Sequence, residues 1–309
     1  MPGAGSSSAG GPRSGGNAGP PEGGSWSRWG PDDERGALNL IGPDAVRRGM
    51  AAVRTGESLT LGLPMVAGKG PLAAMRQPMQ HFMARDGGDY AAGLPERGGF
   101  GFADDSILVA CHGTTHLDAL AHVWRDGQMW NGFPASSVTS RGAARCGIEN
   151  AGPVVTRGLF LDFAGPGPGL APGEAISAAR LADAVTAAGL VPEPGDALLL
   201  RTGWLRQWRD GTAGVDSCPG LATDCADWLR DHEIALAGAD NIAVEAFPAP
   251  DGSVMPMHVA AIRDSGIYLL ELLDLEELAR RGTATFLLIV APLNIVGGVG
   301  SPVAPVAVV

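Results

Sequence analysis

Short apolar runs alternate with segments that carry helix signals over most of the chain. Runs of this length suit buried strands better than helices, and they predict strands at 107–111, 196–202, 234–237, 266–270 and 285–290. The run at 285–290, TFLLIV, is apolar throughout, which predicts a strand covered on both faces. Helix signals predict helices at 44–53, 177–188, 223–232, 257–264 and 274–281. The mixture indicates an α/β fold with a mixed β-sheet.

Two segments lack this alternation. Residues 1–25 consist mainly of Gly, Pro and Ser, have little to bury, and are expected to form a disordered tail. The remaining residues, 26–309, contain no second linker of this kind and are predicted to form one domain. Within it, residues 62–105 are rich in Gly, Pro and Met without a clear period. A loop of that length in a compact domain is usually functional or mobile.

Composition and charge narrow the classes of function. The net charge of −11 argues against nucleic-acid binding, which needs clustered Lys and Arg. Lys69 is the only lysine, which excludes most Schiff-base chemistry and the lysine of a phosphate-binding loop. No apolar run reaches the roughly 18 residues of a membrane span. Without a secretory leader at the start of the sequence, a cytoplasmic location is expected.

The candidate chemistry is concentrated in residues 111–122, CHGTTHLDALAH. This segment places His112, His116, Asp118 and His122 within eleven residues, although the chain has only six histidines. Imidazoles and a carboxylate are ligands that suit Zn²⁺ or Mn²⁺. Three protein ligands leave room for water, and the remaining histidine of the group can move protons near neutral pH. The alternative is a group of histidines in the core or on the surface that binds no metal.

A second pair of candidates lies downstream. His258 opens a predicted helix, and Glu271 ends the apolar strand IYLLE, where catalytic side chains of α/β sheets often lie. Asp240 follows another predicted strand and is either an active-site residue or an ordinary turn aspartate.

Residues 112–122 resemble the H-x-G-T-H-x-D-x-P-x-H signature of the metal-dependent cyclase-like hydrolases, the family of kynurenine formamidase and isatin hydrolase. The resemblance covers about residues 26–309 and indicates the longer branch of the family. Leu120 replaces the signature proline, and Gly113 stands one place early. Further similar segments are WGPDDERGALNLI at 29–41, HVWRDGQMWNGF at 122–133, TRGLFLD at 156–162, LLLRTGW at 198–204 and GGVGSPVAPVA at 297–307.

The resemblance implies a swivelling β/β/α domain, a Zn²⁺ or Mn²⁺ cofactor and a homo-oligomer, either a dimer or a tetramer. It implies that the first metal is held by His112, His116 and Asp118, with Asp118 able to bridge to a second. It further implies that His122 is the catalytic acid or base, and that His258 and Glu271 help to bind the second metal or its water.

Other side chains are candidates for binding the substrate. Trp124 and Trp130 follow the metal motif closely and could stack on a planar ring or simply pack in the core. His81 lies in the Gly- and Met-rich segment, where there is little core for it to join. Arg201 could bind a carboxylate of the substrate or pair with an acidic residue of the protein.

The sequence therefore predicts a metal-dependent amidohydrolase that opens a small cyclic amide, imide, lactone or aryl formamide. A metal-dependent cyclase, dehydratase or isomerase would need the same ligands, so this alternative stays open. A non-catalytic protein that binds a metal or ligand is the alternative of a different class. The expected partners are a small-molecule substrate and copies of the same chain, with no nucleic acid and no membrane.

Overall fold

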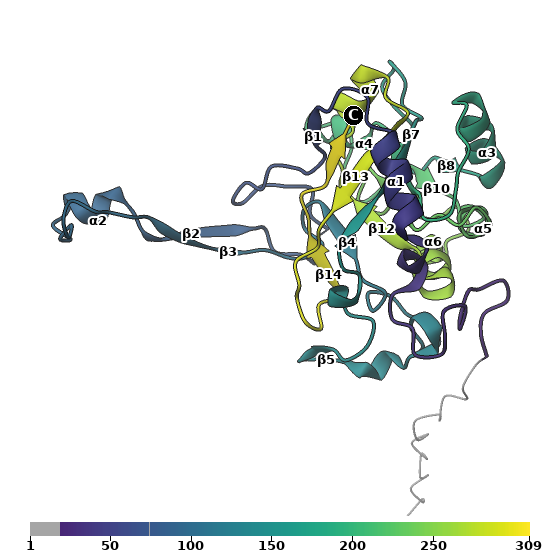
Figure 1. The fold of residues 1–309 in the computed structure, drawn as a ribbon, viewed down its shortest axis with the longest axis horizontal. Helices are drawn as coiled ribbons and strands as arrows, with labels where there is room; N and C mark the ends of the chain where they lie inside the picture. The colour runs from purple at the N-terminus through teal and green to yellow at the C-terminus, as the bar shows by residue number, and fades with distance from the viewer. Residues whose placement is uncertain (1–18, 74) are drawn as a thin grey trace, which may run out of the picture.

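A curled nine-stranded mixed β-sheet forms the centre of the protein in the computed structural model, which describes residues 19–73 and 75–309. The strand order is β1-β15-β13-β7-β9-β11-β12-β4-β14. The four strands from β7 to β12 run parallel, whereas the pairs on either side of them are antiparallel. Figure 1 shows the sheet in the body of the molecule and a narrow arm that projects from it.

The main sheet consists of β1 (Ser58–Thr60), β4 (His116–Asp118), β7 (Val154–Asp162), β9 (Ala197–Arg201), β11 (Leu236–Ala239), β12 (Tyr268–Glu271), β13 (Thr285–Val290), β14 (Gly300–Pro302) and β15 (Val306–Val308). Three two-stranded sheets are formed by β2 (Gln80–Arg85) with β3 (Asp104–Leu108), β5 (Val138–Thr139) with β6 (Gly142–Ala143), and β8 (Ala175–Ile176) with β10 (Gly220–Leu221).

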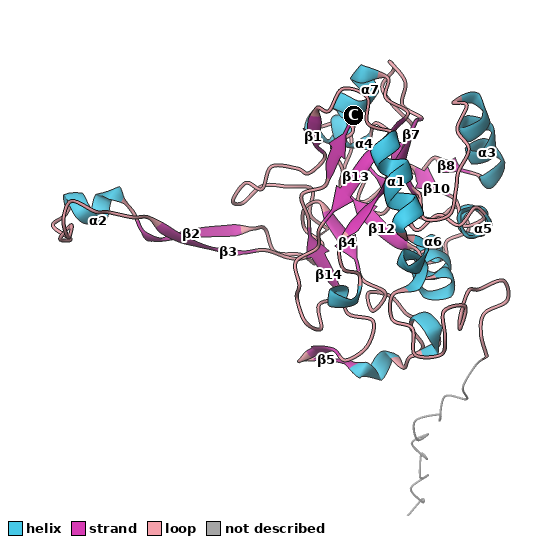
Figure 2. Cartoon of the chain, in the orientation of Figure 1, coloured by secondary structure: helices cyan, strands magenta, loops and turns pink. Residues whose placement is uncertain are grey.

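The α-helices are α1 (Pro43–Ala51), α2 (Gly87–Ala91), α3 (Ala178–Ala187), α4 (Trp204–Arg209), α5 (Cys225–Asp231), α6 (Pro256–His258) and α7 (Glu276–Arg281). A π-helical segment, η5 (Val259–Asp264), continues α6. Figure 2 shows α3 and α5 at the edge of the body and α2 at the tip of the arm. No helix among the described residues is long and apolar enough to cross a membrane.

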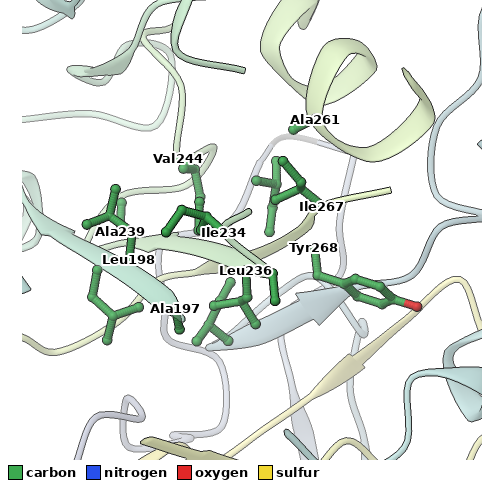
Figure 3. Packing of buried hydrophobic residues seen from close by; sticks show 14 of the residues in the cluster. Ala197, Leu198, Ile234, Leu236, Ala239, Val244, Ala261, Ile267 and Tyr268 are labelled. Atoms are coloured by element: carbon green, nitrogen blue, oxygen red, sulfur yellow. The ribbon is translucent and has the colours of Figure 1, made fainter. Parts of the chain in front are cut away.

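The elements follow from local sequence signals. Ser177 caps α3, as predicted, because its hydroxyl accepts a hydrogen bond from the backbone N–H of Arg180. Gly49 lets α1 pack closely on the sheet, since an added Cβ would lie 2.8 Å from the backbone of Thr156 in β7. The core lies where the parallel strands meet the η5 segment, and Figure 3 shows Leu198, Leu236 and Tyr268 within it.

Most of the predicted elements are present, and the mixed α/β fold is confirmed. Two predictions about strands are wrong in part. The strand predicted as buried at 107–111 is instead β3, Asp104–Leu108, and every residue in it is exposed. The strand at 285–290 is β13, but its residues alternate between buried and half-buried, because α1 covers only part of the sheet.

The long segment at 62–105 is not a structureless loop. It contains β2 and α2, and it forms a hairpin with β3. The period of an exposed hairpin is weak in the sequence because neither face is buried, so there is no selection for an apolar stripe. Of the predicted tail, residues 1–18 lie outside the described residues. Ser25 is buried, and its N–H donates to the carbonyl of Asp264, so contacts with the domain begin before residue 26.

Asp240 directly follows β11 and holds the turn that follows β9. Its Oδ1 accepts hydrogen bonds from the N–H and hydroxyl of Thr202, and its Oδ2 accepts from the N–H of Gly203. Burial raises the pKa of Asp240 to about 6, although these hydrogen bonds favour the carboxylate. Of the two roles considered for Asp240, an active-site residue or a turn aspartate, its contacts are therefore those of a turn aspartate.

We expect Asp240→Asn to lower the free energy of unfolding by about 1–3 kcal/mol, because the new amide NH₂ faces a buried N–H and leaves it without an acceptor. Urea denaturation measures the change. Asp183→Asn on the exposed surface of α3 is the matched control and should change stability by less than about 0.5 kcal/mol. Equal effects of the two substitutions would contradict the structural role of Asp240.

Candidate metal centre

The short strand β4 brings the candidate ligands to one edge of the sheet. In the antiparallel pairing with its two neighbours, His116 lies opposite Glu271 of β12, and Asp118 lies opposite Gly300 of β14. Because side chains alternate along a strand, His116 and Asp118 point to the same face, and Leu117 is buried on the other. Strand register therefore juxtaposes ligands that are far apart in the sequence.

Asp118 lies at the centre of four imidazoles. Its Oδ1 is 3.2 Å from Nε2 of His112, 3.4 Å from Nε2 of His116 and 3.9 Å from Nε2 of His122. Its Oδ2 is 3.7 Å from Nε2 of His258. All four rings thus direct the same nitrogen towards one carboxylate.

Glu271 is the second carboxylate of the cluster. Its Oε2 lies 3.3 Å from Nε2 of His116, and its Oε1 lies 3.2 Å from Nε2 of His258. The structure therefore brings together all six residues that the sequence analysis assigned to metal binding and proton transfer. They are His112, His116, Asp118, His122, His258 and Glu271.

Hydrogen bonds outside the cluster orient two of the rings. Nδ1 of His116 lies 2.8 Å from the carbonyl oxygen of Thr114, and Nδ1 of His258 lies 2.5 Å from Oε1 of Glu245. Glu245 also accepts hydrogen bonds from the backbone N–H groups of Met257 and His258. With Nδ1 engaged as a donor, Nε2 of each ring faces the carboxylates, which is the arrangement found around metal-binding histidines.

The charges of the cluster shift its pKa values strongly. Burial lowers the pKa of His258, but Glu245 and Glu271 outweigh it and raise the value to about 10. Burial raises the pKa of Asp118, but the surrounding imidazoles hold it well below its usual range. Burial lowers the pKa of His122 to about 3, so this ring is neutral. Asp118 is thus held ionised by the neighbouring imidazoles, and a cation can take the place of their protons.

The donor set fits a divalent metal ion. Five buried ligand atoms of the cluster have no hydrogen-bond partner: Nε2 of His112, Nε2 of His116, both carboxylate oxygens of Asp118, and Oε1 of Glu271. Buried polar atoms without partners are rare in proteins and need an explanation such as a bound ion. Nitrogen and oxygen ligands of this kind suit Zn²⁺ or Mn²⁺.

Two groups of side chains that share Asp118 are close enough together to hold a metal ion. One group combines Asp118 with His112 and His122, and the other combines it with His116 and Glu271. In each group the ligand atoms lie within 4.8 Å of one another. Nε2 of His112 and Nε2 of His116, which the family resemblance assigns to the same metal, both lie within 3.4 Å of Oδ1 of Asp118.

Strained backbone flanks the two glutamates. Val244, directly before Glu245, has φ 57°, and Leu272, directly after Glu271, has φ 58°. A left-handed conformation is unfavourable for these residue types and is concentrated at functional sites. Asn241 holds both segments, because its Oδ1 accepts from the N–H of Val244 and its backbone carbonyl accepts from the N–H of Leu272.

The three candidates for substrate binding, Trp124, Trp130 and His81, lie in three different surroundings. Trp124 is half exposed and lies two residues after His122. Trp130 is fully buried, its Nε1 donates to Asp33, and its ring has no exposed face to offer a ligand. His81 lies on the exposed arm, where its Nε2 is 2.7 Å from Oδ2 of Asp105 across the hairpin.

Arg201 pairs with acidic residues of the protein, which is the second of its two predicted roles. It is buried, and its guanidinium donates to Asp162 and, through two nitrogens, to Glu276. These carboxylates occupy the donor atoms that a substrate carboxylate would need.

Sequence reasoning missed two residues that shape the cluster. Glu245 lies in the stretch AVEAFPAP, where a single acidic residue among apolar neighbours is the only local signal. Gly300 belongs to the quoted segment GGVGSP, but glycine has no side chain that would suggest a role. An added Cβ at Gly300 would lie 2.5 Å from Nε2 of His112, so the ring of His112 occupies the space that glycine leaves free.

We expect Gly300→Ala to displace the ring of His112 from Asp118 and to weaken metal binding by about 10–100-fold, as changes around metal ligands commonly do. Metal titration of the purified protein measures the change, with circular dichroism as the check on folding. Gly62→Ala is the matched control, because its added Cβ meets no atom closer than 3.4 Å. Metal binding of wild-type strength in Gly300→Ala would contradict this packing argument.

Comparisons with known proteins agree with this fold. The Cyclase family model matches residues 58–246. The solved structure of a novel cyclase is 35% identical, with a TM-score of 0.85, and the match covers 93% of this chain and 99% of that one.

Two more distant structures share the fold. An isatin hydrolase bound to the product analogue thioisatinate is 19% identical, with a TM-score of 0.61. The match covers 87% of this chain and 99% of the isatin hydrolase chain. A predicted metal-dependent hydrolase from Bacillus stearothermophilus is 18% identical, with a TM-score of 0.54. The match covers 81% of this chain and 97% of the hydrolase chain. No curated protein sequence matches the chain significantly. The family match over more than half of the chain confirms the resemblance, and the chain belongs to the Cyclase family.

Proposed function

We propose that the protein is a divalent-metal-dependent hydrolase that opens a small cyclic amide, imide or lactone, or cleaves an aryl formamide. The observation that carries the proposal is the convergence of four imidazoles on two buried carboxylates, with five buried ligand atoms that lack hydrogen-bond partners. The isatin hydrolases among the structural neighbours support this class of reaction. So does a neighbour described as a potential metal-dependent hydrolase with cyclase activity.

A divalent cation bound by the cluster would supply Lewis-acid polarisation of a carbonyl and activation of water. In the reaction, a C–O bond forms between the carbonyl carbon and the oxygen of water, the bond from that carbon to the leaving nitrogen or oxygen breaks, and the leaving atom takes up a proton. The chain's own residues then have to orient the ligands and to move that proton.

His122 is the residue best placed to move the proton. Its side chain is 24% exposed, whereas those of His116, Asp118, His258 and Glu271 are almost completely buried. An imidazole at this half-open position can accept a proton from water and pass it to the leaving nitrogen or oxygen. The exposed side of the cluster is therefore the side from which we propose the substrate approaches.

Glu245 and Trp124 take supporting roles in the proposal. Glu245 keeps Nε2 of His258 directed at Asp118 and Glu271 through its hydrogen bond to Nδ1. Trp124 offers a half-exposed ring close in sequence to His122 and could stack on a planar substrate. Zn²⁺ and Mn²⁺ are the ions that we propose for the cluster, with one or two per chain.

The variants His116→Ala and His122→Ala should separate metal binding from turnover. His116→Ala removes a fully buried ligand between both carboxylates and should lose metal and activity together. His122→Ala leaves the group of His116, Asp118 and Glu271 intact, so it should retain metal at that group but lose turnover by about 10²–10⁴-fold. Metal analysis by mass spectrometry and kinetic assays measure the two effects.

Full metal occupancy in His116→Ala would contradict the ligand assignment. An unchanged rate in His122→Ala would remove this residue from the mechanism.

Product mass tests the reaction itself. The metal-loaded wild-type protein and His122→Ala should be assayed against a panel of cyclic amides, imides, lactones and aryl formamides, with detection by mass spectrometry. Hydrolysis adds one water to the substrate. Ring closure removes one water, and it is the second candidate reaction because the chain belongs to the Cyclase family. Failure of wild-type protein to convert any member of the panel in the hydrolytic direction would contradict the proposal.

A further inference from the structure

Residues 29–36, WGPDDERG, contribute no ligand to the metal centre, yet they lie against the turn that carries His122. In this β-turn the N–H of His122 donates to the carbonyl of Ala119, 2.9 Å away, and Leu120 is the second residue. An added Cβ at Gly36 would lie 2.9 Å from Cδ1 of Leu120. The segment at 29–36 therefore packs directly on the turn.

The turn of His122 depends on support from other parts of the chain. Leucine at its second position does not fix the backbone φ, as the proline of the family signature would. The side chain of His122 is 24% exposed, whereas that of His116 is 1% exposed. Burial of its own ring thus holds His122 less firmly than it holds His116, and the position of the ring depends on the backbone beneath it.

Cys146 provides part of this support. Its carbonyl accepts a hydrogen bond of 3.0 Å from the N–H of Ala121, the residue directly before His122. Cys146 is fully buried and has φ 60°, a left-handed conformation that is unfavourable for a residue with a side chain. Such a conformation persists only where the surroundings hold it. The direction of the Cys146 carbonyl therefore requires a partner that fixes this residue.

Glu34, within the segment at 29–36, is that partner. Its Oε2 accepts from the N–H of Cys146 at 2.7 Å and from Nδ2 of Asn150 at 3.3 Å. Its Oε1 accepts from the guanidinium of Arg145, also at 2.7 Å. Hydrogen bonds to an ionised carboxylate are shorter and stronger than those between neutral groups. One side chain thus holds the backbone of Cys146 from a segment that is more than a hundred residues away in the sequence.

We propose that Glu34 is a positioning residue for His122 and acts on it through Cys146. The carboxylate of Glu34 holds the N–H of Cys146, and the carbonyl of Cys146 holds the N–H of Ala121. Without the carboxylate, Cys146 can relax to a negative φ and turn its carbonyl away from Ala121. His122 would then shift relative to the metal ligands, and a misplacement of about 1 Å can lower a rate by about 10²-fold. This inference rests on the proposed proton transfer by His122.

Kinetics of the metal-loaded, full-length protein test the proposal. Glu34→Ala should lower kcat by about 10–100-fold, with KM within about threefold of the wild-type value, because it displaces a reacting group. It should bind metal fully, since it removes no ligand. Glu34→Gln keeps an oxygen that can accept from the N–H of Cys146 and loses only the ion pair with the half-exposed Arg145. Its kcat should stay within about threefold of wild type, because exposed ion pairs contribute little.

Glu174→Ala is the matched control. The carboxylate of Glu174 likewise accepts from a backbone N–H, that of Ala171, and pairs with an arginine, Arg180. Neither bond reaches the turn of His122, so kcat should stay within about threefold of wild type, as for other exposed sites. An equal loss of kcat in Glu174→Ala, an equal loss in Glu34→Gln, or a wild-type kcat in Glu34→Ala would each overturn the proposal.

A double-mutant cycle separates positioning of His122 from a general structural effect. Adding Glu34→Ala to His122→Ala should lower kcat no further, because the residue through which Glu34 acts is already missing. The same fold loss in both backgrounds would show that Glu34 acts elsewhere and would overturn the proposal.

Hydrogen exchange gives a readout that does not depend on turnover. Amides of residues 119–122 should exchange faster in Glu34→Ala than in wild type or Glu174→Ala, because the bond from Ala121 to Cys146 has lost its support. Unchanged exchange there would overturn the proposal. If wild-type protein converts no substrate of the panel, the proposed function fails, while the exchange rates still decide whether Glu34 holds the turn.

Discussion

Burying two carboxylates beside four imidazoles is the constraint on which the rest of the structure depends. Removing an ion from water is unfavourable by several kcal/mol, unless opposite charges and hydrogen bonds surround it. Asp118 and Glu271 are almost completely buried, and each is within 4 Å of imidazole nitrogens on more than one ring. The arrangement is stable only if every ring keeps its position, and much of the surrounding fold serves that purpose.

Strand pairing and hydrogen bonds from outside the cluster hold these rings in position. Strand register places His116 beside Glu271, the carbonyl of Thr114 fixes one ring, and Glu245 fixes another. Thr115 adds a further link, because its hydroxyl donates to the carbonyl of Leu272 and accepts from the N–H of Leu63. The left-handed conformations at Val244 and Leu272 are unfavourable by about 1–3 kcal/mol each. The fold therefore accepts local strain where the carboxylates must be aimed.

The parts of the structure that were predictable from the sequence are those with local causes. Four of the five residues of strand β9 are apolar, and α3 begins after a capping serine, so both could be predicted from neighbouring residues. The cluster was found because four of its members lie within one short segment, while His258 and Glu271 stood out at a predicted helix start and strand end and the family resemblance implied their role. Glu245 and Gly300 could not be found in this way, because their roles arise from contacts between segments distant in the sequence.

The arm shows the opposite limit of sequence reasoning. An alternating apolar pattern in the sequence arises where one face of a strand is buried. Neither face of the hairpin formed by β2 and β3 is buried against the body, so the sequence there carries no such pattern. Trp130 illustrates a related ambiguity. An aromatic residue close to a metal motif fits both a binding pocket and the core, and only the three-dimensional packing against Gly266 and Trp29 shows which surroundings it has.

The separation of the ligands along the chain has a consequence for biosynthesis. Thr115, next to the first ligands, contacts Leu272 across 157 residues, and β14 comes later still. Ribosomes add about 5–20 residues per second, so roughly 10–40 s pass between the emergence of His122 and that of Gly300. In the first part of this interval, before residue 245 emerges, the histidine-rich segment has neither Glu245 nor Glu271 beside it. Any ion that the nascent segment captures is therefore held by an incomplete set of ligands, and selection of the correct metal has to wait until the sheet closes around β4.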